Sequence, residues 1–368
     1  ARTAVKFRCE REVLVDALNT AGRAVSSRGG SLPVLAGVRL ELNGDRLVIT
    51  GSDLDLTVTV SVEVAGSDDG VAVVPSKLLS DVVRAVEPGA VELEIDGSDA
   101  QISAGRSQFS LRTIPADEYP QVAEVEGDGV TIDGTALVTA LRQVVPAASS
   151  DDSRPILTGV LMAPEDGGLR LVATDSYRLS VRDLPGTSVL EGDRSILVPS
   201  RALNELTRLI DDDTGVVLHL GERDASFEVG EVRMTTRLIE GDFPNYRGLI
   251  PESNPNKLTV DRSALLDAVR RVRLLAQEAT PVRMAMSDGG LELVAMTQDV
   301  GQAQESVDAG YDGTELTVAF NADYLSVGLD VAPGDEVTLE TVDALKPALL
   351  RSPEHPEFLY LLMPVRVS

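Results

Sequence analysis

The sequence predicts an α+β protein made of three repeated domains, each with two helices packed against antiparallel sheets. The first observation behind this prediction is a set of motifs that recurs with a period of about 123 residues. The second is that each period contains two amphipathic helical stretches and several runs in which apolar residues occupy every second position. With 368 residues, 43% of them apolar, the chain is long enough to give each domain its own core.

The repeat is clearest around the second predicted helix of each domain. The sequence VPSKLL at 74–79 returns as VPSRAL at 198–203 and more faintly as AFNADY at 319–324. A later strand motif leads to Tyr119-Pro120 in the first repeat and to Phe243-Pro244 in the second. The predicted domains are 1–126, 127–253 and 254–368.

The first helix of each domain has one apolar face, because its apolar residues recur three or four positions apart. Asp133 and Asp261 precede two of these helices, where a carboxylate accepts hydrogen bonds from the first free amides. The predicted core residues are Leu14, Ala17, Leu18 and Ala21, then Leu137, Leu141, Val144 and Val145, then Leu265, Leu266, Val269 and Leu275.

The second helix is predicted after Pro75 and after Pro199, since proline suits a first helical turn that needs no amide donor. Runs 57–62 and 91–95 alternate apolar and polar residues, as half-buried antiparallel strands do. The predicted core residues of the second helices are Leu78, Leu79, Val82, Val83 and Val86, then Leu203, Leu206, Leu209 and Ile210.

The net charge of −26 argues against a nucleic-acid partner unless the charges are segregated. The six predicted helices together carry +4, so the rest of the chain carries −30. Either these helices present solvated faces with no partner, or they form a basic surface that follows phosphates without reading sequence. The helices are taken as 10–28, 75–86, 135–148, 199–209, 262–277 and 320–332.

The composition also excludes several classes of protein. No run approaches the roughly 18 apolar residues of a membrane span, and residues 1–6 contain no apolar signal segment. We therefore expect a cytoplasmic protein with no membrane partner. Cys9 is the only cysteine, so an internal disulfide or a thiolate metal cage is excluded, and two histidines, His219 and His355, give little basis for a zinc site.

Two kinds of catalysis are alternatives to a binding role. Asp53 and Asp55 are two positions apart, as a Mg²⁺ pair on a strand would be, but a strand end with solvated carboxylates explains them as well. Neither histidine has the context of an activated nucleophile, and no phosphate-binding glycine loop occurs. The sequence therefore predicts no catalytic residues, no metal and no cofactor. A peptide-binding scaffold that never meets DNA remains an alternative.

Three motifs, together with the repeat, resemble the family of bacterial sliding clamps, the beta subunits of DNA polymerase III. They are 174–179 (TDSYRL), 243–246 (FPNY) and 362–366 (LMPVR), and the resemblance spans the whole chain. It implies that two copies join head to tail into a closed ring of six domains, each chain forming half of it. Helices would line the hole, and the ring would encircle duplex DNA independently of sequence and tether the polymerase without catalysing a reaction.

The resemblance also implies a pocket for a short, mostly apolar peptide motif between the second and third domains. The motif would be carried by the polymerase III alpha subunit, clamp-loader subunits and other polymerases and repair proteins, which would place the chain on the nucleoid during replication. Ser176-Tyr177 departs from the Gly-His or Ser-His of many relatives, and Gly248 from the Arg of some. The matching pocket positions are Leu157, Thr174, Ser176, Tyr177, Arg178, Leu179, Pro244, Leu249, Met363, Pro364, Val365 and Arg366.

Two further residue sets follow from the same resemblance. The first set forms the subunit interface, in which the first domain of one chain would pack against the third domain of the other. The expected interface residues are Arg106, Phe109, Leu111, Leu274, Leu275 and Glu305, with Arg106 paired to Glu305. The expected DNA-facing residues are Arg28, Lys77, Arg142, Arg154, Arg201, Arg270 and Arg271.

Overall fold

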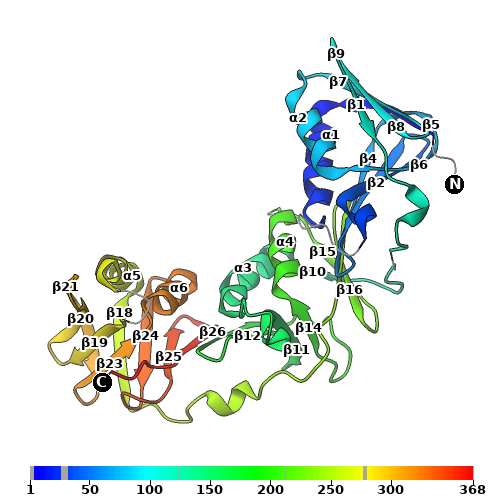
Figure 1. Ribbon diagram of the computed structural model, residues 1–368. Coiled ribbons are helices and arrows are strands. Elements are labelled where there is room, and N and C mark those ends of the chain that lie inside the picture. The colour runs from blue at the N-terminus through cyan, green and yellow to red at the C-terminus, as the bar shows by residue number, and fades with distance from the viewer. Residues whose placement is uncertain (1–3, 26–31, 123, 212, 277–279, 368) are drawn as a thin grey trace. The chain divides into compact units, whose positions relative to one another are not determined.

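The computed structural model describes residues 4–25, 32–122, 124–211, 213–276 and 280–367 (Figure 1). The chain forms two compact units. Unit 1 contains Ala1–Thr135 and Glu205–Leu238, and unit 2 contains Ala136–Asn204 and Ile239–Ser368. Both units combine helices with antiparallel sheets, which confirms the predicted α+β class. No helix of the described residues is long and apolar enough to cross a membrane.

The first repeat contains nine strands and two α-helices in the described residues. The strands are β1 (Val5–Glu10), β2 (Gly37–Asn43), β3 (Arg46–Ser52), β4 (Leu56–Glu63), β5 (Ala65–Asp68), β6 (Gly70–Pro75), β7 (Ala90–Asp96), β8 (Asp99–Ala104) and β9 (Ser107–Arg112). The helices are α1 (Arg11–Gly22) and α2 (Ser76–Ala85), with short 3-10 turns η1 (Pro33–Ala36) and η2 (Ala116–Glu118).

The second repeat has the same order with fewer strands. Its strands are β10 (Val130–Ile132), β11 (Gly159–Glu165), β12 (Gly168–Thr174), β13 (Arg178–Leu184), β14 (Ile196–Pro199), β15 (Val216–Leu220), β16 (Asp224–Val229) and β17 (Val232–Arg237). Its helices are α3 (Gly134–Val144) and α4 (Ser200–Leu209), with η3 (Val145–Ala147), η4 (Pro155–Thr158) and η5 (Tyr246–Leu249).

The third repeat again begins with a strand and a helix. Its strands are β18 (Asn256–Asp261), β19 (Val282–Ser287), β20 (Gly290–Thr297), β21 (Gly301–Val307), β22 (Ala309–Asp312), β23 (Leu316–Phe320), β24 (Glu336–Thr341), β25 (Ala348–Ser352) and β26 (His355–Leu362). Its helices are α5 (Arg262–Val272) and α6 (Ala322–Val331), and η6 (Arg273–Leu275) extends α5.

The strands of neighbouring repeats join into shared sheets. In unit 1 the sheets run β5-β1-β7-β8-β9 and β10-β15-β16-β17-β4-β3-β2-β6, so that β17 of the second repeat pairs with β4 of the first. In unit 2 they run β14-β11-β12-β13-β26-β25-β24-β18-β22 and β21-β20-β19-β23, so that β26 of the third repeat pairs with β13 of the second. Each junction is therefore continuous backbone hydrogen bonding rather than a flexible linker.

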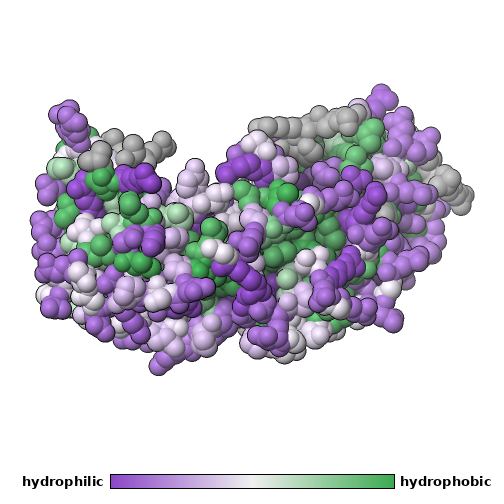
Figure 2. All heavy atoms as spheres, turned by 90° about the horizontal axis from the view of Figure 1, so that it is seen from below, coloured by the Kyte–Doolittle hydropathy of each residue, from purple (hydrophilic) through white to green (hydrophobic). Residues whose placement is uncertain are grey.

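The helices pack as their apolar faces predict. α1 lies beside α2, and α5 beside α6, against the strands of their own repeat (Figure 1). The four predicted core residues of α1 are all buried, and Asp261 caps α5 by accepting a hydrogen bond from the Ala264 amide at 2.8 Å. Hydrophilic residues cover most of the face shown in Figure 2, as burial of the apolar residues requires.

Several details of the helix prediction are wrong. Val82, Leu209 and Ile210 are half-buried rather than in the core, and Pro199 ends strand β14 instead of beginning α4. Leu78 is 53% exposed because it falls outside the stripe of α2 that contacts the sheet. Pro75 is the residue before α2 rather than part of its first turn, since its ψ of 120° is not helical. Leu275 lies in η6, half-buried, because the change from α to 3-10 geometry turns it off the buried face of α5.

The β3–β4, β12–β13 and β20–β21 hairpins turn in the same way. Leu54, Ser176 and Asp299 occupy the same place in these turns, and all three have positive φ angles, of 78°, 80° and 62°. Such angles are uncommon for residues other than glycine. Their recurrence shows that the repeat extends to the backbone conformation of the turn that contains most of the predicted pocket motif.

Candidate functional site

The turn between β12 and β13 is held by its own side chains. The Thr174 hydroxyl donates a hydrogen bond to the Arg178 carbonyl at 2.6 Å and accepts one from the Ser176 amide at 3.2 Å. One carboxylate oxygen of Asp175 accepts from the amides of Tyr177, at 2.9 Å, and Arg178, at 3.0 Å. Thr174 and Asp175 are buried, so these bonds fix the turn and direct Tyr177 outward.

The Arg178 side chain is held by three neighbours: Asp175, Tyr324 and Tyr360. Its Nε donates to Asp175 at 3.1 Å, and its guanidinium lies 4.3 Å from the centroid of the Tyr324 ring, a cation–π contact. Burial acts to lower the pKa of Arg178, but Tyr360 and Asp175 outweigh it and the pKa is raised. Burial also raises the pKa of Tyr360 to about 12, so its hydroxyl stays protonated and donates to the Tyr324 carbonyl at 2.9 Å. Arg178 is therefore a fixed cation.

Tyr177 is 58% exposed, although it is a large aromatic residue. Its ring stacks on that of Tyr324, on α6, with centroids 6.4 Å apart and an angle of 25° between the planes. Tyr324 is positioned by Asn321, whose side chain accepts a hydrogen bond from its amide at 3.1 Å. The sequence-based site did not include Tyr324; the only signal for it was its place in the faint third copy of the helix motif.

The C-terminal tail returns to this turn. The Met363 amide donates to the Tyr177 carbonyl at 2.9 Å, and the Val365 amide donates to the Ala319 carbonyl, on β23, at 2.8 Å. Pro364, between them, has no amide hydrogen to satisfy. The side chains of Val365 and Arg366 are exposed to solvent. The predicted tail residues therefore lie against the predicted turn residues through backbone hydrogen bonds that a sequence motif does not reveal.

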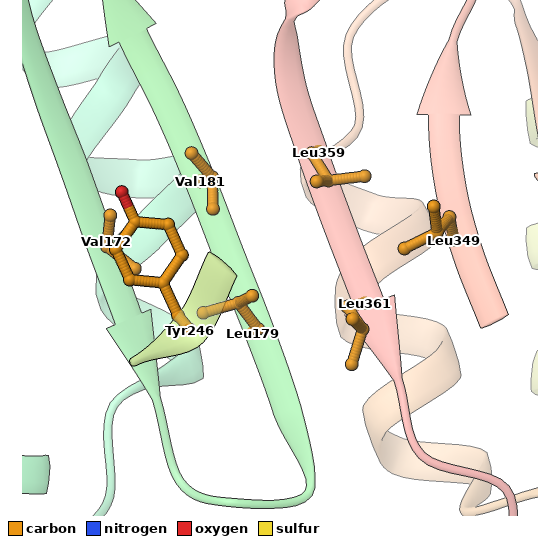
Figure 3. Packing of buried hydrophobic residues seen from close by; sticks show 7 residues of the cluster. All are labelled: Val172, Leu179, Val181, Tyr246, Leu349, Leu359 and Leu361. Carbon is orange, nitrogen blue, oxygen red and sulfur yellow. The ribbon is translucent and has the colours of Figure 1, made fainter. Parts of the chain in front are cut away.

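An apolar cluster forms the sheet surface beside the turn (Figure 3). Tyr246, from η5 in the connection between β17 and β18, lies over β12 and β13, and Met363, Phe243 and Ile250 pack against the same cluster. The Pro244 carbonyl accepts a hydrogen bond from the Tyr246 amide at 2.8 Å. The buried cluster consists of Val172, Leu179, Val181, Tyr246, Leu349, Leu359 and Leu361.

The remaining predicted pocket residues border this surface within unit 2. Leu249, at the end of η5, is 42% exposed. Leu157, in η4, is half-buried, and its amide donates to the Arg154 carbonyl at 3.0 Å. All twelve predicted pocket residues thus lie on four segments of one unit: η4, the β12–β13 turn, the connection that contains η5, and the tail. The combination of exposed aromatic and aliphatic side chains with one fixed cation suits an apolar peptide.

The predicted DNA-facing residues differ in their surroundings. Lys77, Arg142, Arg201, Arg270 and Arg271 are exposed, and Arg28 lies outside the described residues. Arg270 pairs with Asp330 at 3.1 Å, and Arg271 pairs with Glu305 at 2.6 Å. Arg154 pairs with Asp151 at 3.1 Å and also donates to the Ser176 hydroxyl at 3.4 Å. Arg154 therefore lies at the edge of the candidate pocket.

The predicted interface residues lie on or beside two strands, β9 and β21, that form the edges of their sheets. Phe109, 37% exposed, and Leu111 are on the edge strand β9, and Arg106 is exposed just before it. Glu305 is on the edge strand β21, near Leu274, which is 82% exposed in η6. Within the chain Glu305 already binds Arg271, and this hydrogen bond lowers the pKa of Glu305. A bond from Arg106 would therefore have to share that carboxylate.

Asp53 and Asp55, the candidate metal-binding pair, lie in a turn that the Asp53 side chain stabilises. Asp53 lies in the β3–β4 turn, where its Oδ1 accepts hydrogen bonds from the amides of Asp55, at 3.0 Å, and Leu56, at 2.8 Å. The strand geometry assumed for a metal pair is therefore wrong. Within the described parts of the chain, no group of three or more His, Cys, Asp or Glu side chains is placed to hold a metal ion.

Similarity to known proteins extends over the whole chain. Residues 5–123, 131–245 and 247–366 match, in that order, the N-terminal, central and C-terminal domains of the family described as DNA polymerase III beta subunit. The beta sliding clamp of Streptomyces coelicolor is 34% identical over 381 residues, covering 99% of this chain and 100% of that protein. The beta sliding clamp of Synechococcus elongatus is 33% identical, with coverages of 99% and 100%.

Solved structures show the same likeness in three dimensions. The sliding clamp of Bartonella birtlesii, in a structure bound to griselimycin, superposes with a TM-score of 0.94 at 31% identity, covering 99% of this chain and 100% of that one. The beta sliding clamp of C. crescentus gives a TM-score of 0.94 at 30% identity, with complete coverage of both chains, 100% and 100%.

Proposed function

The chain belongs to the DNA polymerase III beta subunit family, the beta sliding clamps, and on this premise we propose that two copies form a closed ring that encircles duplex DNA. A sliding clamp is a processivity factor and a non-catalytic subunit of the polymerase. The ring holds the polymerase on its template by topology, so that tethering needs no sequence-specific contact.

The observation that carries the ring is the pattern of strand edges. The strands β9, β17 and β26 end the three repeats, and β4, β13 and β21 follow the equivalent hairpin turns. Within the chain, β17 pairs with β4 and β26 pairs with β13. Of these six strands, only β9 and β21 lie at sheet edges, where β9 pairs with β8 alone and β21 with β20 alone among the described residues. Pairing β9 of one copy with β21 of another repeats the same junction, and head-to-tail repetition closes a ring when the rotation permits.

The side chains of β9 support this pairing. Phe109 occupies the position that Met234 holds in β17. Met234 pairs with Val58 of β4 and is completely buried, at 0% exposure, whereas Phe109 is 37% exposed. Leu274, 82% exposed, lies beside β21. Such exposed apolar residues beside an open edge indicate a surface that a second chain covers.

The DNA-binding part of the proposal rests on charge. The exposed basic residues Lys77, Arg142, Arg201, Arg270 and Arg271 all lie on helices, while the chain as a whole carries −26. Helices that line a ring would present these cations to phosphates, and an acidic remainder would repel DNA elsewhere. Such contacts position a duplex without reading its sequence.

The pocket around Tyr177 is the proposed docking site for partners. Its aromatic pair, the apolar tail and the fixed guanidinium of Arg178 suit a short peptide that is mostly apolar with few polar groups. The proposed partners are the polymerase III alpha subunit, clamp-loader subunits, and other polymerases and repair proteins that carry such a motif.

The decisive experiment compares circular with linear DNA. Once loaded, the chain is expected to stay on nicked circular duplex through gel filtration and to slide off after a single restriction cut. A free-standing peptide scaffold would leave both DNAs alike, and an ordinary duplex-binding protein would remain on both. Retention that does not depend on DNA ends would therefore overturn the ring, as would the mass of a single chain by light scattering at micromolar concentration.

A further inference from the structure

Two sheets join neighbouring repeats, one through β13 and β26 in unit 2 and one through β4 and β17 in unit 1. At equivalent positions the first carries apolar side chains and the second carries polar ones. In unit 2 the sheet surface beside the connection is apolar, and Tyr246 covers it (Figure 3). The strand registers give the equivalents in unit 1. Leu161, Val172, Leu179, Val181, Leu359 and Leu361 are replaced there by Arg39, Thr50, Thr57, Thr59, Arg233 and Thr235.

The residue that covers the surface is also replaced. Tyr119-Pro120 corresponds to Phe243-Pro244, so Val122 stands where unit 2 has Tyr246. Between residues 115–122 and the sheet lies a cavity of about 910 Å³, lined by Thr50, Thr59, Thr235 and Val122 among others. A smaller cavity of about 140 Å³ shares Val122 and Thr235 with it and reaches Thr57. The larger volume lies in the range of roughly 300–1,000 Å³ that ligand sites occupy.

Arg233 lines this cavity, and its terminal nitrogens are not fully used by neighbouring acceptors. One terminal nitrogen of its guanidinium donates to the Val125 carbonyl at 2.8 Å, and the other lies 3.6 Å from Glu228. Its Nε is buried and has no hydrogen-bond partner among the described residues. A buried guanidinium N–H without an acceptor is costly. The hydroxyls of Thr50 and Thr59 and the terminal nitrogens of Arg233, which line the cavity, offer hydrogen bonds to an incoming carbonyl group.

The connection that covers the cavity is strongly acidic. Residues 115–128 contain five carboxylates and no Lys or Arg. Two of them, Asp117 and Glu124, line the cavity and are exposed to solvent. Arg39 pairs with Glu41 at 2.6 Å, so that cation is already balanced. The opening of the cavity therefore favours a ligand with positive charge.

We propose that this cavity is a second docking site, which binds an extended basic peptide segment of a partner protein. Backbone carbonyls of the segment accept hydrogen bonds from the terminal nitrogens of Arg233 and from the threonine hydroxyls, and its Lys or Arg side chains reach Asp117 and Glu124. The site lies in unit 1 and does not depend on the pocket around Tyr177. It differs from that pocket in kind, because its lining is hydroxyl and charged where the other is apolar.

The probe is a fluorescein-labelled octapeptide of alternating lysine and serine, with an alternating glutamate and serine octapeptide as its counterpart. Anisotropy is measured with the full chain at 150 mM salt, where charges more than about 8 Å apart are largely screened. The Val122→Tyr variant places in the cavity the residue that fills the equivalent space in unit 2. The Asp117→Asn and Glu124→Gln pair removes the lining carboxylates at exposed positions that do not threaten folding.

We expect each variant to weaken lysine-peptide binding at least about tenfold, a loss equivalent to about 1.4 kcal/mol. The matched control is the Glu118→Gln and Glu126→Gln pair, which removes the same charge from the same connection outside the cavity lining. It should leave the affinity unchanged, and Tyr177→Ala in unit 2 should do the same. The proposal is overturned if the control pair loses as much affinity for the lysine peptide as the test variants. It is also overturned if Val122→Tyr binds that peptide as well as the unmodified chain, or if the unmodified chain shows no binding at millimolar peptide.

Discussion

The ring of Tyr177 stacks on the ring of Tyr324, 6.4 Å away, and the guanidinium of Arg178 covers the face of the same Tyr324 ring at 4.3 Å from its centroid. Tyr324 thus connects the exposed aromatic residue of the pocket to its half-buried cation. Because Tyr177 is 58% exposed, the stack with Tyr324 orders a side chain that solvent would otherwise leave free.

The stack predicts how the pocket responds to truncation. Tyr324→Ala should weaken binding of a motif peptide about 2- to 13-fold, since an aromatic pair contributes about 0.5–1.5 kcal/mol beyond its buried area. Isothermal titration calorimetry with the full chain measures the change. Tyr311→Ala, in β22, is the control, because its hydroxyl bonds locally to the Thr314 carbonyl. Equal effects of the two substitutions would contradict the role of the stack.

The backbone of Ser176 predicts a stabilising substitution. Its φ of 80° lies in the region that favours glycine. Ser176→Gly should raise the free energy of unfolding by up to about 1 kcal/mol, because relief of the strain exceeds the entropy that glycine adds to the unfolded chain. Ser61→Gly, within strand β4, should instead lower it. Thermal melting of both variants tests the sign, and a lower melting temperature for Ser176→Gly would refute the prediction.

The sequence predicted the architecture better than the contacts of the site. The repeat, the α1 core, the Asp261 cap and the turn motif follow from local spacing, which periodicity records. Tyr324 and the cavity at Arg233 depend on which strands meet after the chain returns from far along the sequence. Local patterns carry no such information. Leu78 was misplaced for a related reason, because an apolar residue at the border of a stripe is buried only if a neighbour reaches it.

The Cys9 thiol predicts a dependence on pH. Burial, followed by the charge of Glu10, raises the pKa of Cys9 from 9.0 to about 11. The thiol therefore stays protonated in the folded chain at pH 8, and iodoacetamide should modify it more slowly than in guanidinium, where the ordinary pKa returns. Since the folded pKa is raised, the stability that this group contributes is present below pH 9 and is lost as the pH rises toward 11. Equal rates in the folded and unfolded chain would contradict this account.

The open strand edges predict the effect of a charge at the subunit junction. Phe109→Asp should weaken dimerisation about 30- to 150-fold, because burial of a Phe side chain contributes about 2–3 kcal/mol. Leu345→Asp is the matched control, since Leu345 is 61% exposed in the β24–β25 turn and belongs to neither edge strand. Analytical ultracentrifugation over a dilution series gives both dissociation constants. If Phe109→Asp dimerises like the control, β9 is not the junction.

The ion pairs of the helices predict unequal contributions to DNA binding. Arg270 and Arg271 already contact Asp330 and Glu305, so each must share its charge or leave a carboxylate before it can neutralise a phosphate. Arg142 is exposed and has no ion pair among the described residues, so its charge is available at no such cost. Arg142→Ala should therefore weaken DNA binding more than Arg270→Ala does.

Salt titration separates these two cases. Loss of one phosphate contact reduces the slope of log affinity against log salt by about 1. The slope should fall by that amount for Arg142→Ala and by less for Arg270→Ala, measured on the same nicked circular duplex. Asp330→Asn provides the converse test, because it frees Arg270 and should steepen the slope. Suppose that Asp330→Asn leaves the slope unchanged while Arg270→Ala reduces it by the full amount of about 1. The pair with Asp330 then does not restrain Arg270 in the complex.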